Sequence, residues 1–144
     1  MSQQQTEVHS ISAQDAYDLI QRNPRTVFVD VRSTMEYLFV GHPVGAVHVS
    51  WIDEPDWVHN PNFVKEIRKL VLGGQACEAE EECVPILLIC RSGKRSLEAG
   101  RELLRHGFQH VYNVTEGFEG ELDENHQRST INGWRFRGLP WEQS

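Results

Sequence analysis

Short apolar, β-branched runs alternate along the chain with stretches of helical periodicity. Strands are predicted at 26–32 (TVFVDVR), 46–50 (AVHVS), 85–90 (PILLIC) and 110–115 (HVYNVT), and a short one at 8–11 is expected at a sheet edge. The run PILLIC barely alternates, which is typical of a strand covered on both faces. This order of elements predicts an α/β fold with a mostly parallel central sheet and helices on both faces.

Helix ends are marked by local capping signals. Ser12 starts a predicted helix over 13–22 with a capping-box-like pattern. Asn60 and Pro61 predict a cap and a first-turn proline for a second helix that ends near residue 72.

A third helix directly follows the strand PILLIC. It is predicted to begin at Ser92 or Gly93 and to close at Gly107. One short helical turn is expected at 34–40, and the aromatic segment 133–141 is expected to pack back onto the domain.

Length and charge narrow the choice of function. With 144 residues the chain is predicted to form one domain, 1–144, with a core over about 8–141. The formal charge of −7 argues against nucleic acid or an anionic membrane as the main partner. No apolar run approaches the ~20 residues of a membrane-spanning helix, and the polar start lacks a signal-peptide core, so a cytoplasmic protein is expected.

The chain has three cysteines, an odd number that does not suggest a disulfide framework. Cys77 and Cys83 stand six residues apart in an acidic segment, a spacing that fits no common zinc pattern. We interpret both as loop residues and predict no metal site.

Cys90 stands where a buried strand ends and a helix is about to begin. It could be core filler, a redox partner, a metal ligand or a nucleophile. Three of the 14 basic residues, Arg91, Lys94 and Arg95, follow it within five positions. Parallel α/β sheets bind ligands outside the carboxyl ends of their strands, where helix N-termini attract anions and stabilise a thiolate. The pattern therefore favours a nucleophile beside a small anionic ligand.

Two other interpretations of this loop fit less well. A buried filler cysteine would not be followed by so many cations. A phosphate-binding P-loop lacks its first glycine, because Leu88 stands there, and Arg95 replaces the Ser or Thr after the lysine. Gly93 fits both a nucleophile loop and a phosphate-binding loop, because glycine tolerates φ > 0 and lets the backbone amides turn inward.

The segment CRSGKRS at 90–96 resembles the active-site loop of rhodanese-family sulfurtransferases. The resemblance spans about 11–141, is closest to small single-domain rhodaneses, and implies their three-layer α/β fold. Insertions near 73–84 and 118–133 depart from the family pattern. The other landmarks occur in the expected order: Asp30-Val31-Arg32, Glu36-Tyr37, GHPVGAVHV at 41–49, Gly107-Phe108, Val111, Asn113, Gly117 and Gly138-Leu139-Pro140.

The resemblance implies sulfur transfer through a persulfide of Cys90, with no cofactor. Thiosulfate would donate the sulfur, and cyanide, a thiol or a sulfur-carrier protein would accept it. Arg91 and Lys94 are candidates for holding thiosulfate, and Arg95 for holding it or fixing the loop. The whole substrate-binding loop would comprise Arg91, Ser92, Gly93, Lys94, Arg95 and Ser96.

Phosphatases and arsenate reductases of the same fold are the rival enzymes. Their loops have the pattern Cys-x5-Arg, whereas Arg95 follows Cys90 after four residues. The tighter loop favours a single sulfur atom over a phosphoryl group. A non-catalytic docking module is the third alternative, although such modules usually lack the cysteine.

Several polar and aromatic residues outside the loop are interpreted as structural. Asp30 and Arg32 flank a strand end, where such a pair most often locks neighbouring loops, with a direct part in shaping the pocket as the alternative. The histidines of GHPVGAVHV, His42 and His48, show no triad or metal spacing. The four tryptophans, at 51, 57, 134 and 141, are interpreted as core and terminal anchors, with Trp51 or Trp57 at the pocket mouth as the alternative that the sequence leaves undecided.

Overall fold

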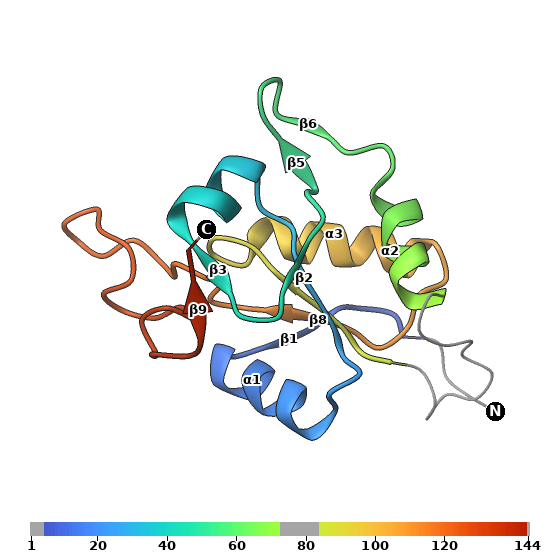
Figure 1. Cartoon of the computed structure of the whole chain (residues 1–144), viewed down its shortest axis with the longest axis horizontal. Helices are drawn as coiled ribbons and strands as arrows, with labels where there is room; N and C mark the ends of the chain where they lie inside the picture. Colours follow the sequence, from blue (N-terminus) through green and yellow to red (C-terminus); the bar gives the residue numbers. More distant parts are fainter. Residues whose placement is uncertain (1–4, 73–83, 144) are drawn as a thin grey trace.

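The computed structural model describes residues 5–72 and 84–143, and it contains one five-stranded parallel sheet. Cys77, Cys83 and nearly all of the insertion 73–84 therefore lie outside the described residues. The strands are ordered β1-β8-β7-β2-β4, with β1 at an edge as predicted (Figure 1). Each strand is shorter than the run that predicted it. Their bounds are β1 His9–Ile11, β2 Val27–Asp30, β4 Val47–His48, β7 Ile86–Ile89 and β8 Val111–Val114.

Helices cover both faces of this sheet, which confirms the predicted three-layer α/β fold (Figure 1). Helix α1 (Ala13–Arg22) lies on one face, and α2 (Phe63–Leu72) and α3 (Lys94–Arg105) lie on the other. Helix α1 has its predicted bounds, and the Ser12 hydroxyl accepts the Asp15 N–H at 3.0 Å. The expected turn at 34–40 is a single wide helical turn, η1 (Glu36–Val40).

The predicted start of α2 is wrong by two residues. The Asn60 side-chain oxygen accepts the N–H of Asn62 at 2.9 Å, and this bond closes a turn that contains Pro61. The helix begins only after that turn, at Phe63. Asn60 therefore caps the turn that precedes the helix and not the helix itself.

Successive side chains of β7, and that of Cys90 directly after it, lie alternately in two separate hydrophobic cores. Leu88 and Cys90 belong to the core under α2 and α3, whereas Leu87 and Ile89 belong to the core under α1. All four are buried, as predicted for a strand covered on both faces. The side chain of Cys90 therefore starts from the sheet face on which α3 packs.

Two small antiparallel ribbons complete the fold. Strand β9 (Trp141–Glu142) pairs with β3 (His42–Pro43), which confirms that the end of the described chain packs back onto the domain. Strands β5 (Ile52–Asp53) and β6 (Val58–His59) form a hairpin that projects beside η1 (Figure 1). Within the described residues, none of the helices is both long and apolar enough to cross a membrane.

Candidate functional site

Cys90 follows β7 directly and is 1% exposed. Its Sγ accepts the backbone N–H of Gly93 at 3.1 Å and lies 3.2 Å from the hydroxyl of Ser96. Both donors belong to the start of α3, where the helix dipole also favours negative charge. The sulfur thus lies within hydrogen-bond distance of two donors at the amino-terminal end of a helix.

Gly93 makes the sharp turn from the loop into α3. Its φ of 96° is in the left-handed region, as expected from its place in the sequence, and it caps the helix that starts at Lys94. A Cβ at this position would lie 2.0 Å from the carbonyl oxygen of Thr115. Any side chain at residue 93 would therefore displace the loop.

Asn113 belongs to β8 and is 2% exposed, and its side chain makes two hydrogen bonds to the segment 93–96. Its side-chain N–H donates to the Gly93 carbonyl at 3.2 Å, and its oxygen accepts from the Ser96 hydroxyl. A hydroxyl has one proton, so Asn113 and Cys90 compete for the donor of Ser96. Asn113 was not predicted to belong to the site, and its one signal in the sequence is a polar side chain inside an otherwise apolar strand.

The other side of the loop is supported by the chain that follows β8. Phe118 N–H donates to the Cys90 carbonyl at 2.8 Å, and Glu119 N–H donates to that of Arg91 at 3.0 Å. A Cβ on Gly117 would lie 2.5 Å from the Arg91 backbone. The loop is thus fixed in position independently of any ligand.

The three cations of the loop differ in their surroundings. Arg91 and Lys94 are exposed, whereas Arg95 forms a two-point ion pair with Glu36 of η1 at 2.8 and 3.0 Å. Burial opposes the charge of the Glu36 carboxyl, but its hydrogen bonds and attraction to Arg95 prevail and lower its pKa to about 2. The sequence left two roles open for Arg95, binding thiosulfate or fixing the loop. The ion pair with Glu36 favours the second role.

The pair gives a pH-dependent prediction. Glu36→Gln should lower the free energy of unfolding relative to wild type at pH 7, because Arg95 loses its carboxylate partner. A lowered pKa stabilises the fold above the unfolded value of about 4.5, and this benefit is lost as the pH falls toward about 2. Urea unfolding at pH 7, 5, 4 and 3 should therefore show the difference shrinking below pH 5.

Glu7→Gln is the matched control, because Glu7 forms an exposed ion pair with Arg101 far from the loop. Exposed pairs contribute little to stability, so this variant should stay close to wild type throughout. A Glu36→Gln difference that is constant with pH would contradict the ionic account.

Asp30 and Arg32 form a fully buried ion pair at the end of β2, with Nη2 and Oδ2 2.6 Å apart. Arg32 also donates to the carbonyl of Gly41 and lies 4.5 Å over the ring of Phe118. These contacts join the end of β2 to Gly41 and to Phe118. This arrangement supports the structural interpretation.

The two histidines have structural contacts. His48 Nε2 lies 2.8 Å from the carbonyl oxygen of Arg32, and both His42 and His48 stack on the ring of Tyr37. Across 5–72 and 84–143, no three His, Cys, Asp or Glu side chains gather in a way that could hold a metal ion.

A cleft of about 690 Å³ opens above the loop. It includes Trp57, which is 56% exposed, whereas Trp51 is buried in the core; this resolves the alternative left by the sequence. The lining residues are Ser33, Glu36, Val40, Ile52, Glu54, Trp57, Arg91, Arg95, Glu119 and Arg128.

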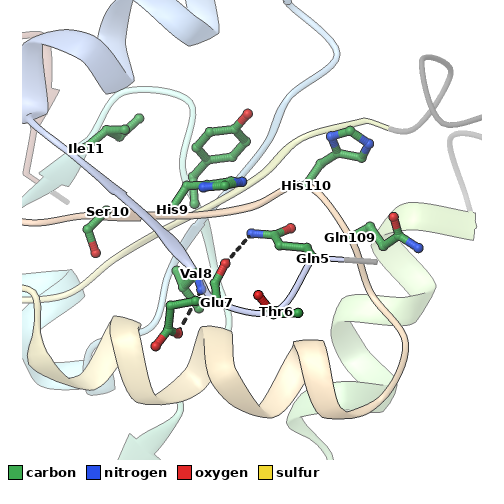
Figure 2. A pocket seen from close by; sticks show the side chains of 10 residues that line it. Gln5, Thr6, Glu7, Val8, His9, Ser10, Ile11, Gln109 and His110 are labelled. Atoms are coloured by element: carbon green, nitrogen blue, oxygen red, sulfur yellow. Dashed lines mark hydrogen bonds between the residues drawn. The ribbon is translucent and has the colours of Figure 1, made fainter. Parts of the chain in front are cut away.

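A second pocket, of about 900 Å³, runs along the edge strand β1 (Figure 2). Gln109 and His110 in its wall precede β8, so they lie at the amino-terminal end of the sheet. Cys90 lies at the opposite, carboxyl end. None of the loop residues 90–96 lines the pocket drawn in Figure 2, whereas Arg91 and Arg95 line the cleft above the loop.

Comparison with known proteins agrees with this geometry. Residues 12–123 match the model of the rhodanese-like domain. An uncharacterised protein of Rickettsia rickettsii is 30% identical over 140 residues, covering 94% of this chain and 98% of the relative. Thiosulfate sulfurtransferase 16 of Arabidopsis thaliana is 28% identical over 133 residues, covering 91% and 90%.

A solved structure, that of Rv0390 from M. tuberculosis, superposes with a TM-score of 0.81 at 36% identity, covering 96% of this chain and all of the other. The fold, the loop after β7 and the family match lead to the same assignment. The chain belongs to the rhodanese-like domain family.

Proposed function

We propose that this protein is a sulfurtransferase that moves a sulfane sulfur from thiosulfate or a persulfide donor to cyanide or a thiol acceptor through a persulfide on Cys90. The observation that carries the proposal is the environment of the sulfur. Cys90 Sγ lies at the start of α3, within hydrogen-bond distance of the Gly93 N–H and the Ser96 hydroxyl. Such donors stabilise both a thiolate and an anionic persulfide.

The reaction takes two half-steps. The Cys90 thiolate attacks the outer sulfur of thiosulfate, an S–S bond forms, and sulfite leaves with the electron pair of the old bond. The acceptor then attacks the outer sulfur of Cys90–S–S⁻, and the electron pair returns to Cys90 as thiolate. Charge balances in each step, and the shared covalent form implies ping-pong kinetics.

Donors on the loop would hold the transferred sulfur. The first backbone N–H groups of a helix lack acceptors within the helix, so those of Lys94, Arg95 and Ser96 are available to an anion at the loop. The persulfide extends the side chain by about 2 Å toward them. Arg91 and Lys94, both exposed, would attract the thiosulfate dianion.

The Arg95 ion pair disfavours a phosphatase. Enzymes with a Cys-x5-Arg loop need a free arginine side chain to bind the phosphoryl group. Here the guanidinium of Arg95 is bound at two points to Glu36. Sulfur transfer does not require a free arginine at this position, so the ion pair supports the sulfurtransferase.

Lys94→Ala should raise the KM for thiosulfate about two- to fivefold, the range for an exposed charge pair, and leave kcat nearly unchanged. The effect should shrink with added salt, since exposed charges are screened over about 8–10 Å. Lys65→Ala, a change of an exposed lysine on α2, controls for net charge. An unchanged KM at low salt would mean that Lys94 does not recruit the donor.

The function itself is tested by incubating the protein with thiosulfate and cyanide. Thiocyanate should form with ping-pong kinetics, as parallel lines in a double-reciprocal plot. Hydrolysis of an aryl phosphate without thiocyanate formation would instead identify the rival enzyme class.

A further inference from the structure

The buried hydroxyl of Ser96 stands between two groups that can each accept its proton in a hydrogen bond. On one side it lies 3.2 Å from Sγ of Cys90, and on the other it is hydrogen-bonded to the side-chain oxygen of Asn113. Ser96 has one proton to donate, so it can serve only one of these acceptors at a time. The better acceptor is the one that carries more negative charge at that moment.

The orientation of the Asn113 side chain is fixed by its other contacts. Its Nδ2 lies 3.2 Å from the Gly93 carbonyl oxygen and 3.3 Å from the hydroxyl oxygen of Ser10. A carbonyl oxygen can only accept, so the group that faces Gly93 is the NH₂ of the amide. The amide oxygen therefore faces Ser96, and because this oxygen too can only accept, the Ser96 hydroxyl is the donor in that bond.

The second donor to the sulfur cannot change its partner in this way. Gly93 N–H lies 3.1 Å from Sγ and belongs to the backbone, which has a positive φ and packs closely against the carbonyl of Thr115. A hydroxyl, by contrast, turns about its Cβ–Oγ bond. Of these two donors, Ser96 is the one that can change its acceptor without any movement of the chain.

The charge on Sγ changes between the two half-reactions proposed above. As a thiolate, Sγ accepts charge-assisted hydrogen bonds, which are about twice as strong as neutral ones. In the persulfide, Sγ is a neutral sulfur bonded to two atoms, and the charge lies about 2 Å further out on the terminal sulfur. A neutral divalent sulfur is a weak acceptor, so the amide oxygen of Asn113 becomes the better partner for the Ser96 hydroxyl.

We infer that Asn113 is a positioning residue for sulfur transfer: it accepts the Ser96 hydroxyl while Cys90 carries the persulfide and releases it to Sγ when the thiolate returns. The inference rests on the proposed persulfide of Cys90. The hydroxyl keeps its proton throughout and only turns between two acceptors. The amide oxygen thereby stabilises the persulfide form, and the hydroxyl stabilises the thiolate that leaves when the sulfur is collected.

This arrangement affects the balance between the two forms of the protein. The first half-reaction can run in both directions, because sulfite can take the sulfur back from the persulfide and re-form thiosulfate and the Cys90 thiolate. Removing the Asn113 oxygen takes a hydrogen bond from the persulfide form, so the balance should move toward the thiolate. Removing the Ser96 hydroxyl takes the stronger, charge-assisted bond from the thiolate, so the balance should move toward the persulfide.

The experiment measures this equilibrium constant on the full chain. Protein is mixed with thiosulfate and sulfite at several fixed ratios and alkylated, and mass spectrometry of the Cys90 peptide gives the fraction that carries one extra sulfur. Asn113→Leu, which has nearly the same side-chain volume, should lower the constant about twofold to tenfold, the value of one neutral hydrogen bond. Ser96→Ala should raise it about fivefold, the difference between a charge-assisted and a neutral bond.

Three further variants separate this role from simple support of the loop. In a Ser96→Ala background, Asn113→Leu should change the constant by less than about twofold, because Asn113 acts on the sulfur through the missing hydroxyl. Asn113→Asp also loses the N–H bond to the Gly93 carbonyl but keeps an acceptor for Ser96, so it should not lower the constant. Ser10→Ala, which removes the other partner of the same NH₂ group, is the matched control and should leave the constant unchanged.

An effect of Asn113→Leu that is equally large with and without the Ser96 hydroxyl would overturn the inference, since it would indicate support of the loop alone. A lowered constant in Asn113→Asp or in Ser96→Ala would overturn it as well, and these two variants decide the matter if circular dichroism shows that Asn113→Leu does not fold. In each case the proposed function would stand. Wild-type protein that forms no persulfide at any ratio of thiosulfate to sulfite would instead contradict the proposed function.

Discussion

Cys90→Ser is expected to reduce thiocyanate formation from thiosulfate and cyanide by at least about a thousandfold, since a nucleophile that forms the covalent intermediate has no substitute. A hydroxyl at this position would accept the same Gly93 and Ser96 donors, so the fold should be preserved. Steady-state rates of thiocyanate production, with circular dichroism as the check on folding, measure the effect.

Ser96→Ala is the informative companion. It removes one donor to the sulfur and leaves the Gly93 N–H, so we expect a smaller loss, of about tenfold to a hundredfold. Asn113 would then keep its bond to the Gly93 carbonyl and hold the loop. Substantial activity in Cys90→Ser would show that another group is the nucleophile.

Arg32→Met is expected to lower the free energy of unfolding by about 3–5 kcal/mol, because it leaves the carboxylate of Asp30 buried without its partner. For a chain of this length the melting temperature should fall by roughly 10 °C. The variant also loses the contact with Phe118, whose N–H holds the Cys90 carbonyl, so the remaining folded protein should turn over more slowly.

A double variant, Asp30→Leu with Arg32→Met, separates charge from packing. With both charges removed, much of the lost stability should return, although the donor to the Gly41 carbonyl is still missing. Denaturant unfolding of the two single variants and the double variant gives the coupling between the residues. A cost below about 1 kcal/mol for Arg32→Met would contradict the role assigned to the pair.

Features that depend on local sequence were predicted most successfully. The run PILLIC indicated a doubly covered strand, and its side chains do enter two cores. Ser12 marked the start of α1 to the residue, and Gly93 has the positive φ expected of it. In each case the signal lies within a few neighbouring residues.

Features that depend on distant parts of the chain could not be predicted. Glu36 and Arg95 are 59 residues apart, and no local pattern indicates that they pair. Trp51 is buried by contacts with Phe63, His59 and Glu98, which are 8 to 47 residues away in the sequence, so its burial has no local signal. The place of Arg128 at the cleft depends in the same way on how segment 118–133 folds back.

The most direct test of the central claim is mass spectrometry of the full chain after incubation with thiosulfate alone, followed by proteolysis under non-reducing conditions. The account predicts a gain of ~32 Da, one sulfur atom, confined to the Cys90 peptide and removed by cyanide. Cys77 and Cys83 are internal controls and should stay unmodified. No gain at Cys90, or an equal gain on the peptides of Cys77 and Cys83, would contradict it.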